Sequence, residues 1–98
     1  MVGELLIDPG RHLVKVGDRS VPLTRKEFAL LYVLASDPTR VFSRAELLRD
    51  VWDEDGRPTR NGIRKLNSHI SRLRRKLDPE GTRYVFNCWG IGYRLVGE

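Results

Sequence analysis

The sequence of 98 residues contains a single cysteine, Cys88, and this scarcity excludes two kinds of site. One cysteine cannot form a disulfide within the chain or supply a multi-cysteine metal site. No apolar run approaches the roughly 18 residues that suggest a membrane span, and the first residues do not read as a secretory signal. We therefore expect a cytoplasmic domain with no membrane association.

Acidic residues are absent from one stretch, 57–77, which holds eight Lys or Arg residues. The rest of the chain has ten basic and thirteen acidic residues, so the formal net charge of +5 arises in this stretch alone. Solvated helix faces usually interleave Glu with Lys. An acid-free basic segment instead favours a polyanionic partner, and nucleic acid fits better than an anionic membrane.

The sequence also lacks a recognisable catalytic arrangement. It has two histidines, His12 and His69, and neither belongs to a recognisable arrangement of carboxylate, histidine and nucleophile. We expect His69 to pack at a helix shoulder and Cys88 to pack in a strand. No enzymatic activity, cofactor or metal is therefore expected.

Short apolar segments near the start of the chain predict a small antiparallel sheet within residues 4–23. The segments "ELLI", "HLVKV" and "SVPL" are partly β-branched and are separated by the turn signals "DPG" and "GD". Near the end, "RYVFNCWGIGYRLV" alternates around "GIG", which predicts a β-hairpin at 83–96.

Three helices are predicted between these strands. "TRKE" and "SRAE" are capping boxes that begin the first two, and Pro38 ends the first because proline cannot continue a helix. "RVF" reads as a short extended link between them. The order predicts one α+β domain over 1–98, a helix-turn-helix followed by a wing. We expect the helices at about 24–36, 43–52 and 60–77.

The third predicted helix has one apolar stripe and one polar face. The stripe falls within an arc of about 80° at roughly 100° per residue and should face the core. The opposite face interleaves arginine with serine, which suits a DNA major groove, where arginine bonds both acceptors of guanine and asparagine reads adenine. Arg75 lies near the centre of this face and is expected to contact phosphate. The stripe consists of Ile63, Leu66, Ile70, Leu73 and Leu77.

Four segments in order, "VPLTRKEFALLYVLA", "RVFSRAELLRDVW", "SHISRLRRKL" and "WGIGYRLV", resemble the winged-helix effector domain of OmpR/PhoB-type response regulators. The resemblance implies a four-stranded N-terminal antiparallel sheet, three helices and a C-terminal β-hairpin wing. It implies sequence-specific binding of double-stranded DNA for transcription regulation, with the third helix in the major groove and the wing at the minor groove. Two copies arranged head-to-tail on direct repeats are also implied.

The resemblance also implies site residues. Segment 53–62 looks like the part that touches RNA polymerase in this family. Phosphate contacts of the second helix fall on Arg44 and Trp52, and wing contacts on Asn87, Trp89 and Tyr93. The base and phosphate contacts of the third helix fall on Arg64, Lys65, Asn67, Ser68, Ser71, Arg72 and Arg74.

The sequence departs from the family pattern at three places. Segment 53–62 is longer than the common form. Asn67 and Ser71 stand where the family often has an acid and an arginine, so we expect a different target sequence. Trp89 replaces the usual arginine at the wing tip. Activators that regulate antibiotic production in actinomycetes use a related domain with the same "SRLRR", and that subclass stays open.

The sequence leaves two other binding functions to consider. A winged helix can serve as a protein-interaction module, for RNA polymerase or another regulator, with weak or non-specific DNA binding. RNA binding is not favoured because no exposed aromatic positions are evident on a sheet. In the predicted hairpin, strict alternation places Tyr84 and Phe86 inward and Trp89 outward.

Overall fold

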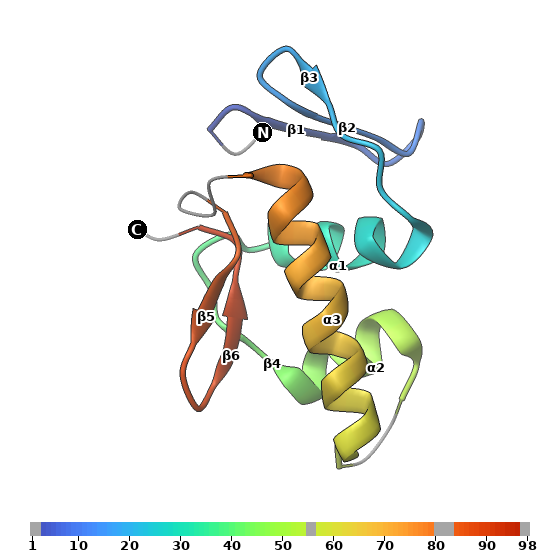
Figure 1. Cartoon of the computed structure of the whole chain (residues 1–98), viewed down its shortest axis with the longest axis vertical. Coiled ribbons are helices and arrows are strands. Elements are labelled where there is room, and N and C mark those ends of the chain that lie inside the picture. Colours follow the sequence, from blue (N-terminus) through green and yellow to red (C-terminus); the bar gives the residue numbers. More distant parts are fainter. Residues whose placement is uncertain (1–2, 55–56, 80–83, 97–98) are drawn as a thin grey trace.

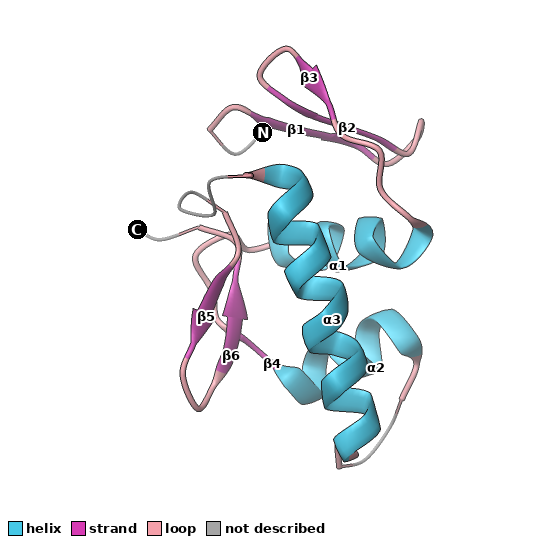
Figure 2. Cartoon of the chain, in the orientation of Figure 1, coloured by secondary structure: helices cyan, strands magenta, loops and turns pink. Residues whose placement is uncertain are grey.

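The computed structural model describes residues 3–54, 57–79 and 84–96 of the chain. An N-terminal sheet lies at one end, three helices form the middle, and a second sheet flanks the third helix (Figures 1 and 2). Residues 55–56 of the predicted polymerase segment and residue 83 of the predicted hairpin lie outside the described residues. The elements are β1 Leu5–Asp8, β2 Leu13–Val16, β3 Arg19–Ser20, α1 Arg25–Ala35, β4 Phe42–Ser43, α2 Arg44–Trp52, α3 Arg60–Leu77, β5 Phe86–Cys88 and β6 Gly92–Arg94.

The N-terminal sheet is antiparallel, in the order β1-β2-β3. The implied fourth strand is wrong for the residues that the structure describes, and the third strand lies earlier than the segment "SVPL" suggested. The amide of Val21 still donates to the carbonyl of Val14 at 2.9 Å. Pro22 follows and has no amide proton, so the ladder cannot continue.

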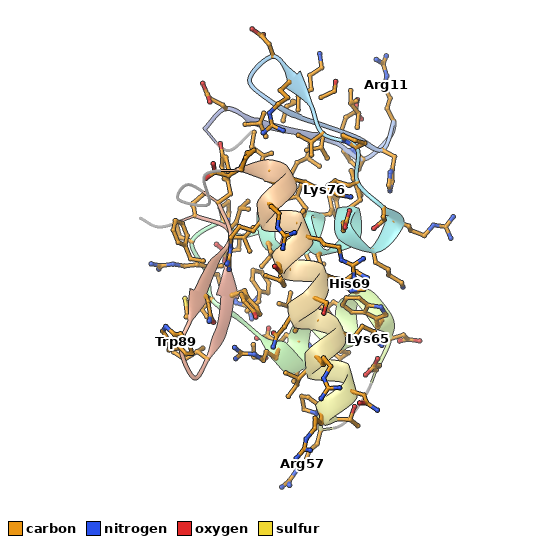
Figure 3. All side chains as sticks on the ribbon, in the orientation of Figure 1. Arg11, Arg57, Lys65, His69, Lys76 and Trp89 are labelled. Carbon is orange, nitrogen blue, oxygen red and sulfur yellow. The ribbon has the colours of Figure 1, made fainter. Side chains whose placement is uncertain are left out.

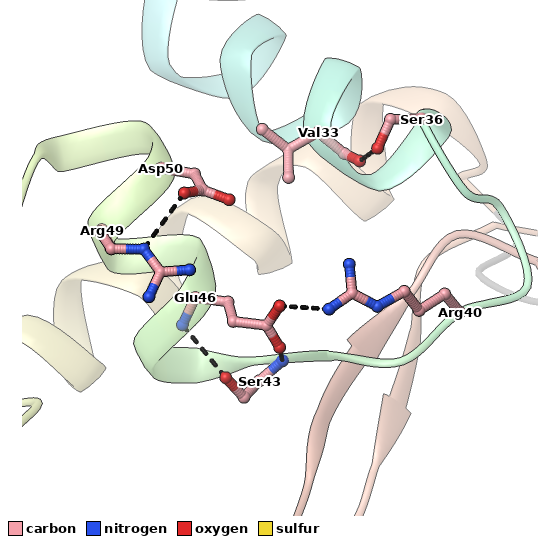
Figure 4. Close-up of polar contacts among 7 residues, drawn as sticks. All are labelled: Val33, Ser36, Arg40, Ser43, Glu46, Arg49 and Asp50. Carbon is pink, nitrogen blue, oxygen red and sulfur yellow. Dashed lines mark hydrogen bonds and ion pairs between the residues drawn. The ribbon is translucent and has the colours of Figure 1, made fainter.

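Both predicted capping boxes are present. Thr24 Oγ1 accepts from the amide of Glu27, whose carboxylate accepts from the amide of Thr24, and Ser43 and Glu46 make the same exchange. Arg40 adds an ion pair to the Glu46 carboxylate, so the start of α2 is also tied to the preceding link (Figure 4). α1 and α2 begin one residue after their caps, at Arg25 and Arg44.

The link "RVF" contains a strand, which the sequence did not indicate. Phe42 pairs with Tyr93, and Ser43 with Gly92, so the second sheet has the order β4-β6-β5. A Cβ on Gly92 would lie 1.9 Å from the carbonyl oxygen of Phe42, so only glycine allows this approach. The hairpin is therefore attached by backbone bonds to the strand that leads directly into α2.

The core lies where α1, α2 and α3 meet. Leu66, Ile70, Leu73 and Leu77 are fully buried along α3, as their spacing predicted, whereas Ile63 is only half-buried. Leu30, Leu31 and Leu34 of α1 and Leu47 and Leu48 of α2 pack with them, and the same core includes Leu5, Val14 and Phe42 of the two sheets. Among the described residues, no helix combines the length and apolar character that crossing a bilayer requires.

The alternation predicted for the second sheet fails at one residue. Val85 has φ of +62°, a left-handed conformation that is unfavourable for a β-branched side chain. It and Tyr84 are both buried, although they were expected on opposite faces, and Phe86 is only half-buried. Trp89 nevertheless points outward, as predicted, with 88% of its surface exposed.

Candidate nucleic-acid interface

The outer face of α3 forms a shallow open groove. Thr59 caps the helix by accepting from the amide of Gly62 at 3.0 Å, so the groove begins at the first turn. Of the side chains that the structure describes, no acidic one lines it. Its lining is Arg60, Ile63, Arg64, Asn67, Ser68, Ser71, Arg72 and Arg75.

Arginines in this groove are held only loosely by their own helix. Arg72 Nε donates to the carbonyl of Ser68 at 3.4 Å, and Arg75 Nη2 donates to Ser71 Oγ at 3.3 Å. Both bonds are long, and both side chains are exposed, so their other donors can reach a ligand. Ser68 and Ser71 are small and exposed beside them, which lets a polyanion approach the helix closely.

One shoulder of α3 carries a cluster of cations around Trp52. Lys65 Nζ lies 5.2 Å and Lys26 Nζ 5.8 Å from the centre of the indole, and the His69 ring meets it edge-on at 4.9 Å. Trp52 is half-buried, so its indole is packed within this cluster. Attraction between the ring and the two ammonium groups helps to position Lys26 and Lys65. His69 Nδ1 donates to the carbonyl oxygen of Lys65 at 2.8 Å, which confirms that this histidine packs at the helix shoulder.

Lys65 also forms an ion pair with Glu54, which comes from the connection before α3. The acid-free character of the outer face therefore ends at this shoulder. α3 begins at Arg60, as predicted, so residues 60–62 of the segment implied to touch RNA polymerase belong to the helix and the connection after α2 ends at Thr59.

The other side of α3 is joined to the wing. The Tyr93 hydroxyl donates to Asn67 Oδ1 at 2.5 Å, and Arg74 Nε donates to the carbonyl of Val85 at 2.9 Å. Tyr93 is buried and Arg74 is half-buried. Both residues were predicted to contact DNA, and the structure shows them holding the hairpin against the helix.

The remaining predicted wing residues lie nearer the surface. Arg44 places its guanidinium 5.2 Å from the Tyr93 ring centre and donates to Asn87 Oδ1 at 3.4 Å. Trp89 is at the hairpin tip, on the opposite side of α3 from Lys65 and His69 (Figure 3). The predicted residues therefore come from three elements, α2, α3 and the wing, and they differ in exposure from the buried Tyr93 to the exposed Trp89.

Sequence reasoning missed two basic residues of this surface. Arg60 lines the groove, and its place in the acid-free stretch was an available signal. Lys26 donates to the carbonyl of Val51 at 2.9 Å and reaches the Trp52 cluster from α1. No local sequence pattern predicts this contact, because Lys26 and Val51 are far apart in the chain. Within the residues that the structure describes, no three His, Cys, Asp or Glu side chains gather as a metal site would require.

Comparisons with known proteins give a consistent result. The model of the family described as "Transcriptional regulatory protein, C terminal" matches residues 18–95. The chain is 38% identical to the transcriptional regulatory protein ResD of Bacillus subtilis over 94 residues, covering 93% of this chain. It is 40% identical to the uncharacterized transcriptional regulatory protein YclJ of the same organism over 85 residues, covering 87% of this chain. It spans 38% of the length of ResD and 36% of that of YclJ.

Solved structures of DNA complexes share the fold. The DNA-binding domain of the response regulator AdeR, in complex with an intercistronic region, superposes with a TM-score of 0.85 at 29% identity, covering 100% of this chain and 99% of that one. The DNA-binding domain of RstA from Klebsiella pneumoniae, in complex with the RstA box, gives 0.84 at 27% identity, covering 96% and 92%.

Proposed function

The chain belongs to the family of C-terminal domains of transcriptional regulatory proteins, with the winged-helix fold of response-regulator DNA-binding domains, and we propose that it binds double-stranded DNA sequence-specifically to regulate transcription. In this proposal α3 enters the major groove and the β5–β6 wing meets the neighbouring minor groove.

The observation that carries the proposal is the acid-free groove on α3. A helix that only needed solubility would mix acids with its arginines. Here the exposed Arg64 and Arg72 flank small serines, so the backbone of α3 can approach a base-pair edge. Each guanidinium presents paired donors that match O6 and N7 of guanine. Asn67 has its amide oriented by Tyr93, which leaves its Nδ2 donors for a base.

Phosphate contacts are assigned to the margins of this groove. Arg75 is exposed in the last turn of α3, and Arg44 lies at the start of α2. Lys26 and Lys65, arranged around Trp52, supply charge on the other shoulder. Such contacts set the register of the protein on the duplex and make the affinity depend on salt.

Assembly and partners follow as further parts of the proposal. Two copies bind direct repeats head-to-tail, in the bacterial cytoplasm, and the part of segment 53–62 that precedes α3 faces RNA polymerase. Asp53 is exposed there, whereas Glu54 is engaged with Lys65. The family is one of transcription regulators, and we assign no catalytic activity to this member.

Selection of binding sites from random duplex DNA, followed by footprinting, tests the proposal. We expect one enriched motif, protection on one face of the duplex, and affinity that falls steeply as salt rises. An Arg64→Ala/Arg72→Ala double variant, checked for its fold by circular dichroism, is the matched control and should lose the motif. A wild-type chain that enriches no sequence would instead favour the protein-interaction module.

A further inference from the structure

The tip of the wing exposes two large apolar side chains. Trp89 is 88% and Ile91 59% exposed, and they flank Gly90, whose φ is +77°. The turn is closed by the amide of Ile91, which donates to the carbonyl of Cys88 at 3.0 Å. Only two other large apolar side chains are exposed in the described part of the chain, Leu6 and Tyr32. Such a concentration on one turn usually marks a contact surface.

This tip is held in a fixed position relative to α3. At the base of the hairpin the amide of Val85 donates to the carbonyl of Leu95 at 2.7 Å, and Arg74 bonds the carbonyl of Val85. Along its length, Tyr93 bonds Asn67 of α3 and pairs with Phe42 of β4. The wing therefore loses little conformational entropy on binding, and its tip has a fixed position beside the α3 groove.

We propose that Trp89 and Ile91 form an apolar wedge that enters the minor groove next to the α3 site, partly unstacks one base step and bends the duplex. The inference rests on the proposed function. The occupant is DNA because the hairpin that carries the tip is bonded to α3 through Tyr93 and Asn67, and because Arg44 at the start of α2 donates to Asn87 of the same hairpin, which places a guanidinium beside the wing. Apolar side chains that wedge between base steps are known to kink duplexes toward the major groove.

The wedge predicts how the wing contributes to specificity. A charged tip would favour the narrow, electronegative minor groove of an A-tract. Trp89, Gly90 and Ile91 carry no charge, so this attraction is missing at the tip. An unstacking wedge instead favours steps that are easily kinked, which are the pyrimidine–purine steps TA and CA/TG. The wing thus selects a deformable step that it does not read by hydrogen bonds.

The test uses the duplex obtained by site selection, with 2-aminopurine placed in turn at each step within half a helical turn of the α3 footprint. This base fluoresces more when it is unstacked. We expect the wild-type chain to raise its fluorescence at one position and to bend an end-labelled duplex by roughly 20–90°, measured by energy transfer. Replacing a TA step at that position by a GC step should weaken binding by roughly tenfold.

Variants separate the wedge from the rest of the interface. Trp89→Ala/Ile91→Ala should keep the α3 footprint and lose both the fluorescence rise and the bend, while Tyr32→Ala, an exposed aromatic on α1, should change neither. Trp89→Arg should bind as well as the wild type without unstacking, with preference moved toward A-tracts.

Two outcomes would overturn the inference. A wild-type complex with a normal α3 footprint, a straight duplex and no unstacked base would remove the wedge and leave the proposed function intact. A double variant that bends DNA like the wild type, with both apolar residues gone, would do the same. Failure of the wild-type chain to bind any duplex would remove the proposed function and the wedge together.

Discussion

The hydroxyl of Tyr93 in the wing donates a hydrogen bond of 2.5 Å to Oδ1 of Asn67 on α3. This contact joins the two elements that are proposed to face DNA through one pair of side chains, one of them buried. It makes the orientation of the Asn67 amide depend on the wing.

Tyr93→Phe should therefore affect both stability and recognition. Loss of this bond should lower the free energy of unfolding by about 0.5–1.5 kcal/mol and weaken discrimination at the base that Asn67 contacts. Denaturant melts and competition with single-base variants of the site measure the two effects. Tyr32→Phe, which removes an exposed hydroxyl, is the control, and equal behaviour of the two variants would contradict the role given to Tyr93.

Arg64→Ala and Arg72→Ala should each cost roughly 1–3 kcal/mol of specific binding, because each removes a paired donor from the α3 groove. Titration of selected and scrambled duplexes measures the loss. If the double variant still prefers the selected site while its fold is intact, α3 does not read the sequence.

Arg74 and Arg75 are neighbours with different expected effects. Arg75→Ala should weaken binding to all sequences alike. It should also reduce the slope of log affinity against log salt concentration by about one unit. Arg74→Ala should instead lower the melting temperature, because its bond to the Val85 carbonyl is partly buried. Melting curves and salt titrations of both variants decide the matter. If Arg74→Ala leaves the melting temperature unchanged but lowers the salt dependence of binding, Arg74 contacts DNA and does not stabilise the wing.

Leu66→Ala, Ile70→Ala and Leu73→Ala should each destabilise the fold by roughly 2–5 kcal/mol, because these side chains are fully buried along α3. Ile63→Ala is the matched control on the same helix and should cost less, since Ile63 is half-buried. Urea unfolding followed by circular dichroism measures the series, and wild-type stability in all three buried variants would show that the rotation of α3 is wrong.

Acid should destabilise the fold through Glu27. Burial raises the pKa of its carboxyl, but hydrogen bonds from Lys76 and Thr24 outweigh this and leave the pKa below its usual range. The unfolded chain then binds the proton more readily. The stabilisation is present above the ordinary glutamate pKa of about 4.3 and is lost as the pH falls through the folded value.

Glu27→Gln removes this titration. We expect it to melt lower than the wild type at pH 7 and to show a smaller fall in melting temperature between pH 7 and pH 3. Glu46→Gln provides a comparison, because hydrogen bonds from Ser43 and the charge of Arg40 also hold the pKa of Glu46 low. If the melting temperatures of Glu27→Gln and wild type fall by the same amount between pH 7 and pH 3, Glu27 is not the cause of the acid destabilisation.

Local patterns predicted the helices well. Thr24 and Ser43 predict where their helices begin, because a capping box involves only four consecutive residues. The apolar stripe of α3 follows from helical periodicity, and the outer groove from the lack of acids on the opposite face. The exposure of Trp89 was also predicted, although strict alternation does not hold at Val85.

Features that depend on distant residues were not predictable in this way. Phe42 looks like part of a link because its strand partner, Tyr93, lies in another segment. Arg74 looks like a DNA contact until the Val85 carbonyl is placed beside it, and the left-handed Val85 has no signal in its side chain. Which basic residues face DNA and which support the wing is therefore a property of the tertiary packing.

The C-terminal end of α3 bears on the order of folding. Arg19 of β3 donates to the carbonyl of Lys76 at 3.0 Å and, through its other terminal nitrogen, to that of Leu77 at 2.8 Å. Arg19 and Lys76 are 57 residues apart. The last carbonyls of α3 thus gain these partners only after a long loop has closed, and contacts of such separation slow folding. During synthesis, the N-terminal sheet can meet α3 only after residue 77 has left the ribosome. We therefore expect the sheet and α3 to become fully ordered together, in one late step.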